Sequence, residues 1–127
     1  SRSDEEERIG SEIVNAAFDV HTALGPGLLE SMYEKCFCHE LRLRGLSVTK
    51  QVAVPIQYKD LDLKGGLRLD VLVEDKIICE IKAANADPGI FRAQLLSYMK
   101  LTGKQLGYLI NFNVPKIKDG ITRMVLG

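Results

Sequence analysis

Two short apolar runs on either side of a polar tripeptide constrain the fold of this chain more than any other stretch. The first run covers residues 68–73 and the second covers residues 77–82, with Glu74-Asp75-Lys76 between them. Both are rich in β-branched and other strand-forming residues, so the pattern predicts a β-hairpin. Side chains alternate between the two faces of a sheet. We therefore expect Leu69, Val71 and Val73 on one face of the first strand, and Arg68, Asp70 and Leu72 on the other.

Charged side chains interrupt these apolar strands. Alternation in the second strand puts Glu80 and Lys82 on one face with Ile78, opposite to Ile77, Cys79 and Ile81. An unpaired buried carboxylate is costly, so Asp70 and Glu80 each need a charged partner or a metal ion. If the two share a side of the sheet, they form an oxygen-ligand pair for a hard divalent cation, with Lys82 beside them. The alternative is an internal ion pair of Lys82 with Glu80 or Asp70 on a half-exposed sheet.

Length and composition narrow the class of protein. A chain of 127 residues is long enough for one domain with a single core, and we expect that domain to cover residues 1–127. No apolar run approaches the ~20 residues of a membrane span, so no membrane association is expected. Residues 1–8 are acidic and polar, unlike a signal peptide, and we expect them to be partly frayed. The three cysteines have no framework spacing, which favours reduced thiols in a cytoplasmic protein.

The charges are distributed unevenly. The net charge is zero, which argues against a general nucleic-acid binder. Residues 1–45 carry five Lys or Arg and nine Asp or Glu, whereas residues 46–127 carry twelve and eight. The second part therefore has a net charge of +4, which permits a local phosphate-binding surface.

The first part of the chain predicts two helices. Negative charge at residues 4–8 suits a helix N-terminus, and Gly25-Pro26-Gly27 ends that helix. Its core face carries His21, which we interpret as a core histidine rather than a ligand. The residues of that face recur at helical spacing: Ile13, Ala17, Val20, His21 and Leu24.

The second helix is expected over residues 28–44, with one acidic residue on an otherwise apolar stripe. Tyr33, Phe37 and Leu41 mark the core-facing stripe, and Glu30 falls on it. A glutamate in the first turn complements the helix dipole, which is the simpler explanation. Alternatively, Glu30 reaches a metal site, either as a further ligand or as a carboxylate that contacts the ligands without binding the metal.

The remaining segments complete an α/β fold. Residues 48–58 predict a strand, in which Pro55 indicates an edge or a bulge. Asp87-Pro88 predicts the start of a third helix that ends at Thr102-Gly103. Strands follow over residues 105–112, parallel to a neighbour, and over residues 121–126. We expect two N-terminal helices, a mixed sheet of four to five strands and a helix before the last strands, with no nucleotide cofactor because no phosphate-binding glycine motif occurs.

One face of the third helix carries polar groups among apolar ones. Phe91 and Leu95 are expected in the core, and Gln94 and Tyr98 share their side. Gln94 needs hydrogen-bond partners there, and a strand backbone is the simplest choice. Tyr98 either donates a hydrogen bond or packs. On the other faces, Arg92 and Lys100 are candidate phosphate contacts or solvated surface residues.

Several motifs resemble known proteins. Asp70, with Glu80-Ile81-Lys82 ten positions on, resembles the active-site signature of the PD-(D/E)xK nuclease superfamily. Residues 27–33, Gly-Leu-Leu-Glu-Ser-Met-Tyr, resemble the motif that names the GxxExxY family, which is assigned to that superfamily. Further similar segments occur in the same order: Gln-Val-Ala-Val-Pro-Ile at residues 51–56, Arg-Leu-Asp at 68–70 and Ala-Gln-Leu-Leu-Ser-Tyr at 93–98. The likeness extends over residues 13–123.

The resemblance implies a restriction-endonuclease-like fold and a set of roles. Asp70 and Glu80 would hold Mg²⁺ or Mn²⁺ together with the Ile81 carbonyl, and Lys82 would orient the attacking water or stabilise negative charge. Gln94 would orient Lys82, a water molecule or the ligands of the metal ion. Glu30 would bind a second cation or position the ligands of the first. Tyr33, Tyr98 and Arg68 are expected to support the site.

The resemblance also implies a partner and a reaction, namely hydrolysis of phosphodiester bonds in DNA or RNA. Two alternatives stay open. One is a nucleic-acid-binding module that keeps the fold and the charged residues without catalysis. The other is a protein-interaction or scaffolding domain, and a homodimer or a protein partner is compatible with each of these functions.

Overall fold

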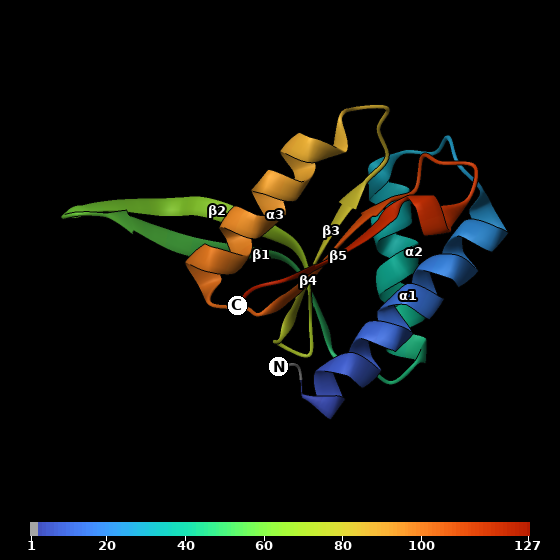
Figure 1. Ribbon diagram of the computed structural model, residues 1–127, viewed down its shortest axis with the longest axis horizontal. Coiled ribbons are helices and arrows are strands. Elements are labelled where there is room, and N and C mark those ends of the chain that lie inside the picture. The colour runs from blue at the N-terminus through green and yellow to red at the C-terminus, as the bar shows by residue number, and fades with distance from the viewer. Residues whose placement is uncertain (1–2) are drawn as a thin grey trace.

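The computed structural model describes residues 3–127 as a mixed five-stranded sheet with helices on both faces (Figure 1). The strand order across the sheet is β1-β2-β3-β4-β5. The elements are α1 (Asp4–Leu24), α2 (Glu30–Leu43), β1 (Val48–Tyr58), β2 (Leu61–Val73), β3 (Ile77–Lys82), α3 (Pro88–Thr102), β4 (Leu106–Asn111), a 3₁₀ turn η1 (Ile117–Asp119) and β5 (Ile121–Val125). Helices α1 and α2 cover one face, and α3 lies on the other (Figure 1). The predicted α/β fold is confirmed.

Helix α1 begins with a capping box. The Ser3 hydroxyl accepts a hydrogen bond from the Glu6 amide, and the Glu6 carboxylate accepts one from the Ser3 amide. The helix ends at Gly25 as predicted. His21 is buried on the core face, and its Nε2 lies 2.8 Å from the Val114 carbonyl oxygen, so it is a satisfied core histidine. Ser1 and Arg2 lie outside the described residues, and the fraying of residues 1–8 stays a prediction.

Helix α2 starts two residues later than predicted. Leu29 caps it without a side-chain hydrogen bond, and Glu30 is its first residue. Tyr33, Phe37 and Leu41 are fully buried, as predicted. Glu30 is exposed, so its placement on the buried stripe is wrong. Glu30 is the first residue of the helix, one turn before the buried Tyr33, and the core does not cover its side chain there.

Strands β1 and β2 form a long hairpin that projects from the rest of the molecule (green in Figure 1). β1 is an edge strand, and its pairing with β2 shifts register between Val54 and Ile56, on either side of Pro55, as its position predicted. The part beyond this shift exposes Tyr58, Leu61 and Leu63. β2 is one continuous strand of 13 residues, so the glycines at 65 and 66 do not end it.

The crossover from β3 through α3 to β4 makes those two strands parallel, as predicted. The Asp87 carboxylate accepts a hydrogen bond from the Gly89 amide at 2.9 Å, and Pro88 is the first helical residue. Gly103 ends α3 with a φ of 73°. Local signals alone therefore set both ends of this helix.

The sheet separates two apolar clusters. The larger one lies under α1 and α2 and includes Val71, Val73 and Cys79, while the smaller one lies under α3 and includes Ile78 and Leu95. Leu69 belongs to the smaller cluster, so its predicted place on the side of Val71 and Val73 is wrong. The ladder between β1 and β2 skips the pair Gln51 and Asp70, and Gln51 has a φ of 51°. The side chains of β2 therefore do not alternate strictly between the two faces of the sheet across this irregularity, and Leu69 lies on the face of α3.

Candidate active site

Asp70 and Glu80 meet where the pairing of β2 with β3 ends. The last register pair of the two strands is Val71 with Cys79. Beyond it, side chains replace backbone partners: Glu80 Oε2 accepts a hydrogen bond from the Asp70 amide at 3.0 Å, and Asp70 Oδ2 accepts one from the Ile81 amide at 3.0 Å. The two carboxylates therefore lie side by side at a separation of the strands, held by main-chain amides on both sides.

The environment of this pair disfavours two negative charges. Glu80 is 2% exposed, and Asp70 is half-buried. Burial, followed by the negative charge of Asp70, raises the pKa of Glu80 to about 8. A cation between Asp70 and Glu80 would compensate their negative charges and would therefore be bound favourably.

The atoms at the Asp70–Glu80 pair that could coordinate a metal ion are oxygen atoms. In a strand, the amide and the carbonyl of one residue point to the same side. The Ile81 amide faces Asp70, so the Ile81 carbonyl also faces β2, beyond the end of the ladder. Two carboxylates and a carbonyl form a donor set that suits Mg²⁺ or Mn²⁺. Within residues 3–127, no three His, Cys, Asp or Glu side chains gather into a ready metal cluster.

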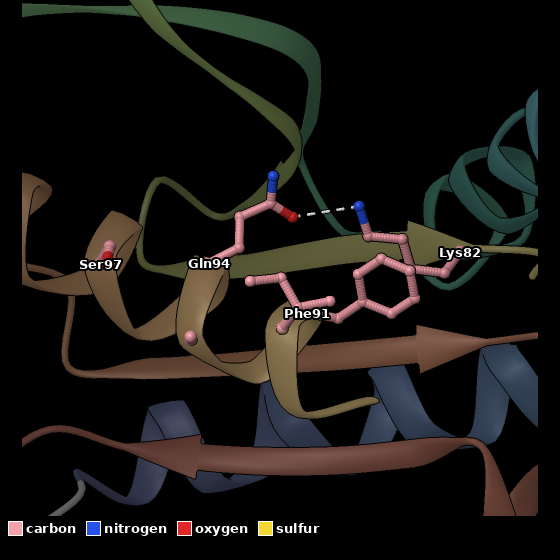
Figure 2. A pocket seen from close by; sticks show the side chains of 6 residues that line it. Lys82, Phe91, Gln94 and Ser97 are labelled. Carbon is pink, nitrogen blue, oxygen red and sulfur yellow. Dashed lines mark hydrogen bonds between the residues drawn. The ribbon is translucent and has the colours of Figure 1, made fainter. Parts of the chain in front are cut away.

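Lys82 projects from the end of β3 and is held by α3. Its Nζ donates a hydrogen bond to Gln94 Oε1 at 3.1 Å and lies 4.7 Å from the centroid of the Phe91 ring (Figure 2). Gln94 Nε2 donates to the Tyr98 hydroxyl at 2.8 Å, which turns the amide oxygen toward the ammonium. No ion pair joins Lys82 to Asp70 or Glu80 in the described part of the chain. The internal ion pair considered from the sequence is thus not formed.

The first helical turns of α2 bring two further carboxylates near this site. Although Glu30 is exposed overall, partial burial of its carboxylate, followed by the charge of Asp70, raises its pKa, and it also interacts with Lys82 and with the Ala83 backbone. Burial raises the pKa of Glu34, with a smaller contribution from Asp70. Glu34 also accepts a hydrogen bond from Gln51 Nε2 at 3.0 Å. Glu34 is not among the predicted site residues, although its spacing of four residues from Glu30 is a signal for a shared helix face.

Other predicted residues lie elsewhere. The Tyr33 hydroxyl donates to the Gly25 carbonyl at 2.5 Å and accepts from the Leu28 amide at 3.1 Å, so it holds the loop between α1 and α2. Arg68 donates to the Gln51 carbonyl at 2.9 Å. Arg92 is exposed in the first half of α3, and Lys100 is exposed about two turns beyond Gln94.

Phe91 and Gln94 agree only in part with the expectations. Phe91 is half-buried and packs against the smaller apolar cluster, and its ring faces the Lys82 ammonium. Gln94 bonds two side chains instead of a strand backbone, and its contact with Lys82 is one of those that the resemblance implies.

A comparison with protein families decides the class. The family model described as the PD-(D/E)XK nuclease superfamily matches residues 7–124. The chain belongs to this superfamily. Its α/β architecture is consistent with a restriction-endonuclease-like fold, and membership of the superfamily indicates a nuclease-type function. The chain matches no curated protein and no solved structure. None of the helices within residues 3–127 combines the length and the apolar character that crossing a membrane requires.

Proposed function

We propose that this superfamily member is a divalent-metal-dependent nuclease that hydrolyses phosphodiester bonds in DNA or RNA. The contact of Asp70 and Glu80 at the end of the β2–β3 ladder is the observation that carries the proposal. Asp70, Glu80 and the Ile81 carbonyl would hold Mg²⁺ or Mn²⁺. Such a cation, when bound, supplies a Lewis acid that activates water and stabilises charge on the phosphate.

The residues around Asp70 and Glu80 would position the reacting groups and help to retain the cation. Lys82 carries a positive charge on the same strand, two residues after Glu80, and we assign it to the attacking water or to a phosphate oxygen. Gln94 positions the Lys82 ammonium and is itself oriented by Tyr98. Glu30 and Glu34 add negative charge at the edge of the site, which would help to retain a cation.

Within the superfamily, we propose membership of the GxxExxY family. The three residues of that motif have distinct physical roles that support the assignment. Gly27 has a φ of 99°, which a glycine adopts without strain. Glu30 interacts with Asp70 and Lys82 across the site, and Tyr33 holds the loop that contains Gly27. The motif would therefore place a carboxylate at the metal site.

The decisive experiment measures cleavage of labelled single- and double-stranded DNA and RNA with Mg²⁺ or Mn²⁺. We expect Asp70→Asn, Glu80→Gln and Lys82→Ala each to lower the cleavage rate by about 10²-fold or more without unfolding the domain. Gln94→Ala should lower it by about 10- to 100-fold, because Lys82 loses its positioning partner.

Matched controls use exposed residues of α1 and α2 that are not part of the proposed site. Glu5→Gln and Lys35→Ala remove the same kinds of charge and should cleave like the wild type. Equal metal-dependent cleavage by the wild type and all site variants would contradict the proposal. Calorimetry with Mn²⁺ distinguishes the nuclease from the inactive nucleic-acid-binding module. The inactive module predicts that Mn²⁺ does not bind, or that Glu80→Gln leaves Mn²⁺ binding unchanged.

The protein-interaction alternative has one observation in its favour. The end of the β1–β2 hairpin exposes Tyr58, Leu61 and Leu63, which is unusual for a surface that meets only water. Sedimentation over a range of protein concentrations tests this alternative. A monomer at every concentration that still cleaves nucleic acid would leave it without support. The homodimer, the protein partner, the single-domain organisation and the cytoplasmic location stay predictions.

A further inference from the structure

Phe91 stands between two hollows at the start of α3. One, of about 400 Å³, is lined by Lys82, Ile90, Phe91, Ala93, Gln94 and Ser97 (Figure 2). The other, of about 300 Å³, lies on the other side of Phe91, toward Asn85, Arg92 and the ends of β4 and β5. Each volume is in the range of small-ligand sites and would take one nucleotide.

The two hollows lie beside the reacting groups of the proposed nuclease. Lys82 lines the first hollow, and its Nζ is 4.7 Å from the Phe91 ring centroid. A phosphate held at Lys82 therefore leaves the adjoining sugars and bases of its strand next to Phe91. Nucleotides that flank the scissile bond would therefore be within reach of these hollows.

The walls of the two hollows differ in chemistry. Around the first, Ile90 is 66% exposed beside Ala93 and Phe91, an apolar wall that suits the face of a base. The second has donors and acceptors: Asn113 Nδ2 donates to Asn85 Oδ1 at 2.8 Å, which leaves the Asn85 amide nitrogen and the Asn113 carbonyl oxygen for a ligand. Asparagine amides pair well with base edges. Asp119 lines this hollow together with Arg92, so a base or sugar fits it better than a phosphate alone.

On the basis of the proposed nuclease function, we propose that the two hollows hold successive nucleotides of an unpaired strand on either side of Phe91. In a duplex, both faces of a base are covered by its neighbours and its pairing edge is occupied. An aromatic side chain between two base-sized hollows can separate bases only if they are unstacked. The chemistry recognised is therefore the unpaired nucleobase, which DNA and RNA share.

The test compares binding of fluorescein-labelled oligonucleotides by anisotropy in EDTA, where no cleavage occurs. The probes are single-stranded DNA, single-stranded RNA and the duplex of the same sequence. We expect the wild type to bind a single strand about tenfold more tightly than the duplex. Phe91→Leu keeps apolar packing but removes the ring, and should weaken single-strand binding by about tenfold while leaving duplex binding unchanged. Phe91→Ala should weaken it further.

The control is Leu101→Ala, an exposed apolar residue in the last turn of the same helix, which should bind like the wild type. Thermal melting of each variant shows that it is folded. Equal binding of single strand and duplex by the wild type, or unchanged single-strand binding by folded Phe91 variants, would overturn the inference. If the Phe91 variants cleave single strands as fast as the wild type does, the inference about the two hollows is overturned but the nuclease proposal is not. Absence of metal-dependent cleavage in the wild type would instead overturn the nuclease proposal.

Discussion

At the scale of single residues, the site is organised around one buried acid. Glu80 is almost inaccessible, yet its carboxylate is tied to the Asp70 amide rather than to a cation of the protein. Lys82 is two residues away on the same strand, but its ammonium is directed to Gln94. The protein thus keeps its own positive charge beside the carboxylates without forming an ion pair with them, which fits the divalent cation that we propose.

The raised pKa of Glu80 makes the stability of the metal-free protein depend on pH. The folded chain keeps this proton up to about pH 8, whereas the unfolded chain releases it near pH 4.5. Between these values the unfolded state binds fewer protons, so the free energy of unfolding falls as pH rises. The contribution is complete only below about pH 4.5 and is lost through about pH 8.

Urea unfolding in EDTA at about pH 5 and about pH 8 checks this prediction. The wild type should lose more stability over this interval than Glu80→Gln, by an amount on the order of a few kcal/mol. Glu30 and Glu34 contribute with the same sign to both proteins, so the difference isolates Glu80. Parallel pH profiles of the two proteins would show that the buried acid does not hold its proton.

At the scale of elements, glycines set how closely the helices approach the sheet. Gly10 on α1 faces Tyr108 of β4, and a Cβ there would collide with the hydroxyl and with Cζ at 3.3 Å. Gly107 on β4 lies under α3, where a Cβ would meet Met99 Sδ at 2.9 Å and Leu95 Cδ1 at 3.0 Å. Close approach on both faces positions α3, and with it Gln94, against the end of β3.

Replacing Gly10 with alanine separates helix propensity from packing. Alanine favours a helix interior over glycine by up to about 1 kcal/mol, but overpacking a buried contact costs about 1–3 kcal/mol. Tyr108 is 4% exposed and its hydroxyl bonds Arg123, so displacing it has a cost, and we expect Gly10→Ala to be destabilising overall. Ser11→Ala, on the exposed side of the same turn, should change stability little. A stabilised Gly10→Ala protein in urea unfolding would show that α1 can shift.

At the scale of the whole molecule, the apolar packing is uneven. The cluster under α1 and α2 holds most of the buried residues, whereas α3 covers a smaller one that continues along the base of the β1–β2 hairpin. The end of that hairpin extends past α3 into solvent (Figure 1). The core that fixes Asp70 and Glu80 therefore does not depend on the projecting end.

Shortening the hairpin tests this division. Ile56 and Leu63 are register partners, so residues 57–62 can be replaced with Asn-Gly, a two-residue turn. We expect the unfolding free energy to change by about 0.5 kcal/mol or less, because the removed side chains are exposed. Leu67→Ala, at the buried base of the same hairpin, should cost about 2–4 kcal/mol. A large loss from the shortened hairpin would mean that its end packs against the body.

Much of the fold was predictable because its signals are local. The bounds of β1, the turn between β2 and β3, and both ends of α3 follow from Pro88, Gly103 and strings of β-branched residues, which act on their own backbone. The buried side of Leu69, the exposure of Glu30 and the start of α2 were predicted wrongly. For Leu69, strict alternation was continued through the irregularity at Gln51 and Asp70, and for the other two the helical period was continued to or beyond the first residue of α2.

The sequence by itself determined which residues are the candidates for the chemistry, since Asp70, Glu80 and Lys82 are charged residues in an otherwise apolar hairpin, where burial without a partner is costly. Only the tertiary structure decided how they meet. The ladder stops beside Asp70, Gln94 turns its oxygen to Lys82, and Glu34 and Phe91 join the site from two helices. These distances depend on register, twist and close packing between segments far apart in the chain, and no local pattern of residues contains that information.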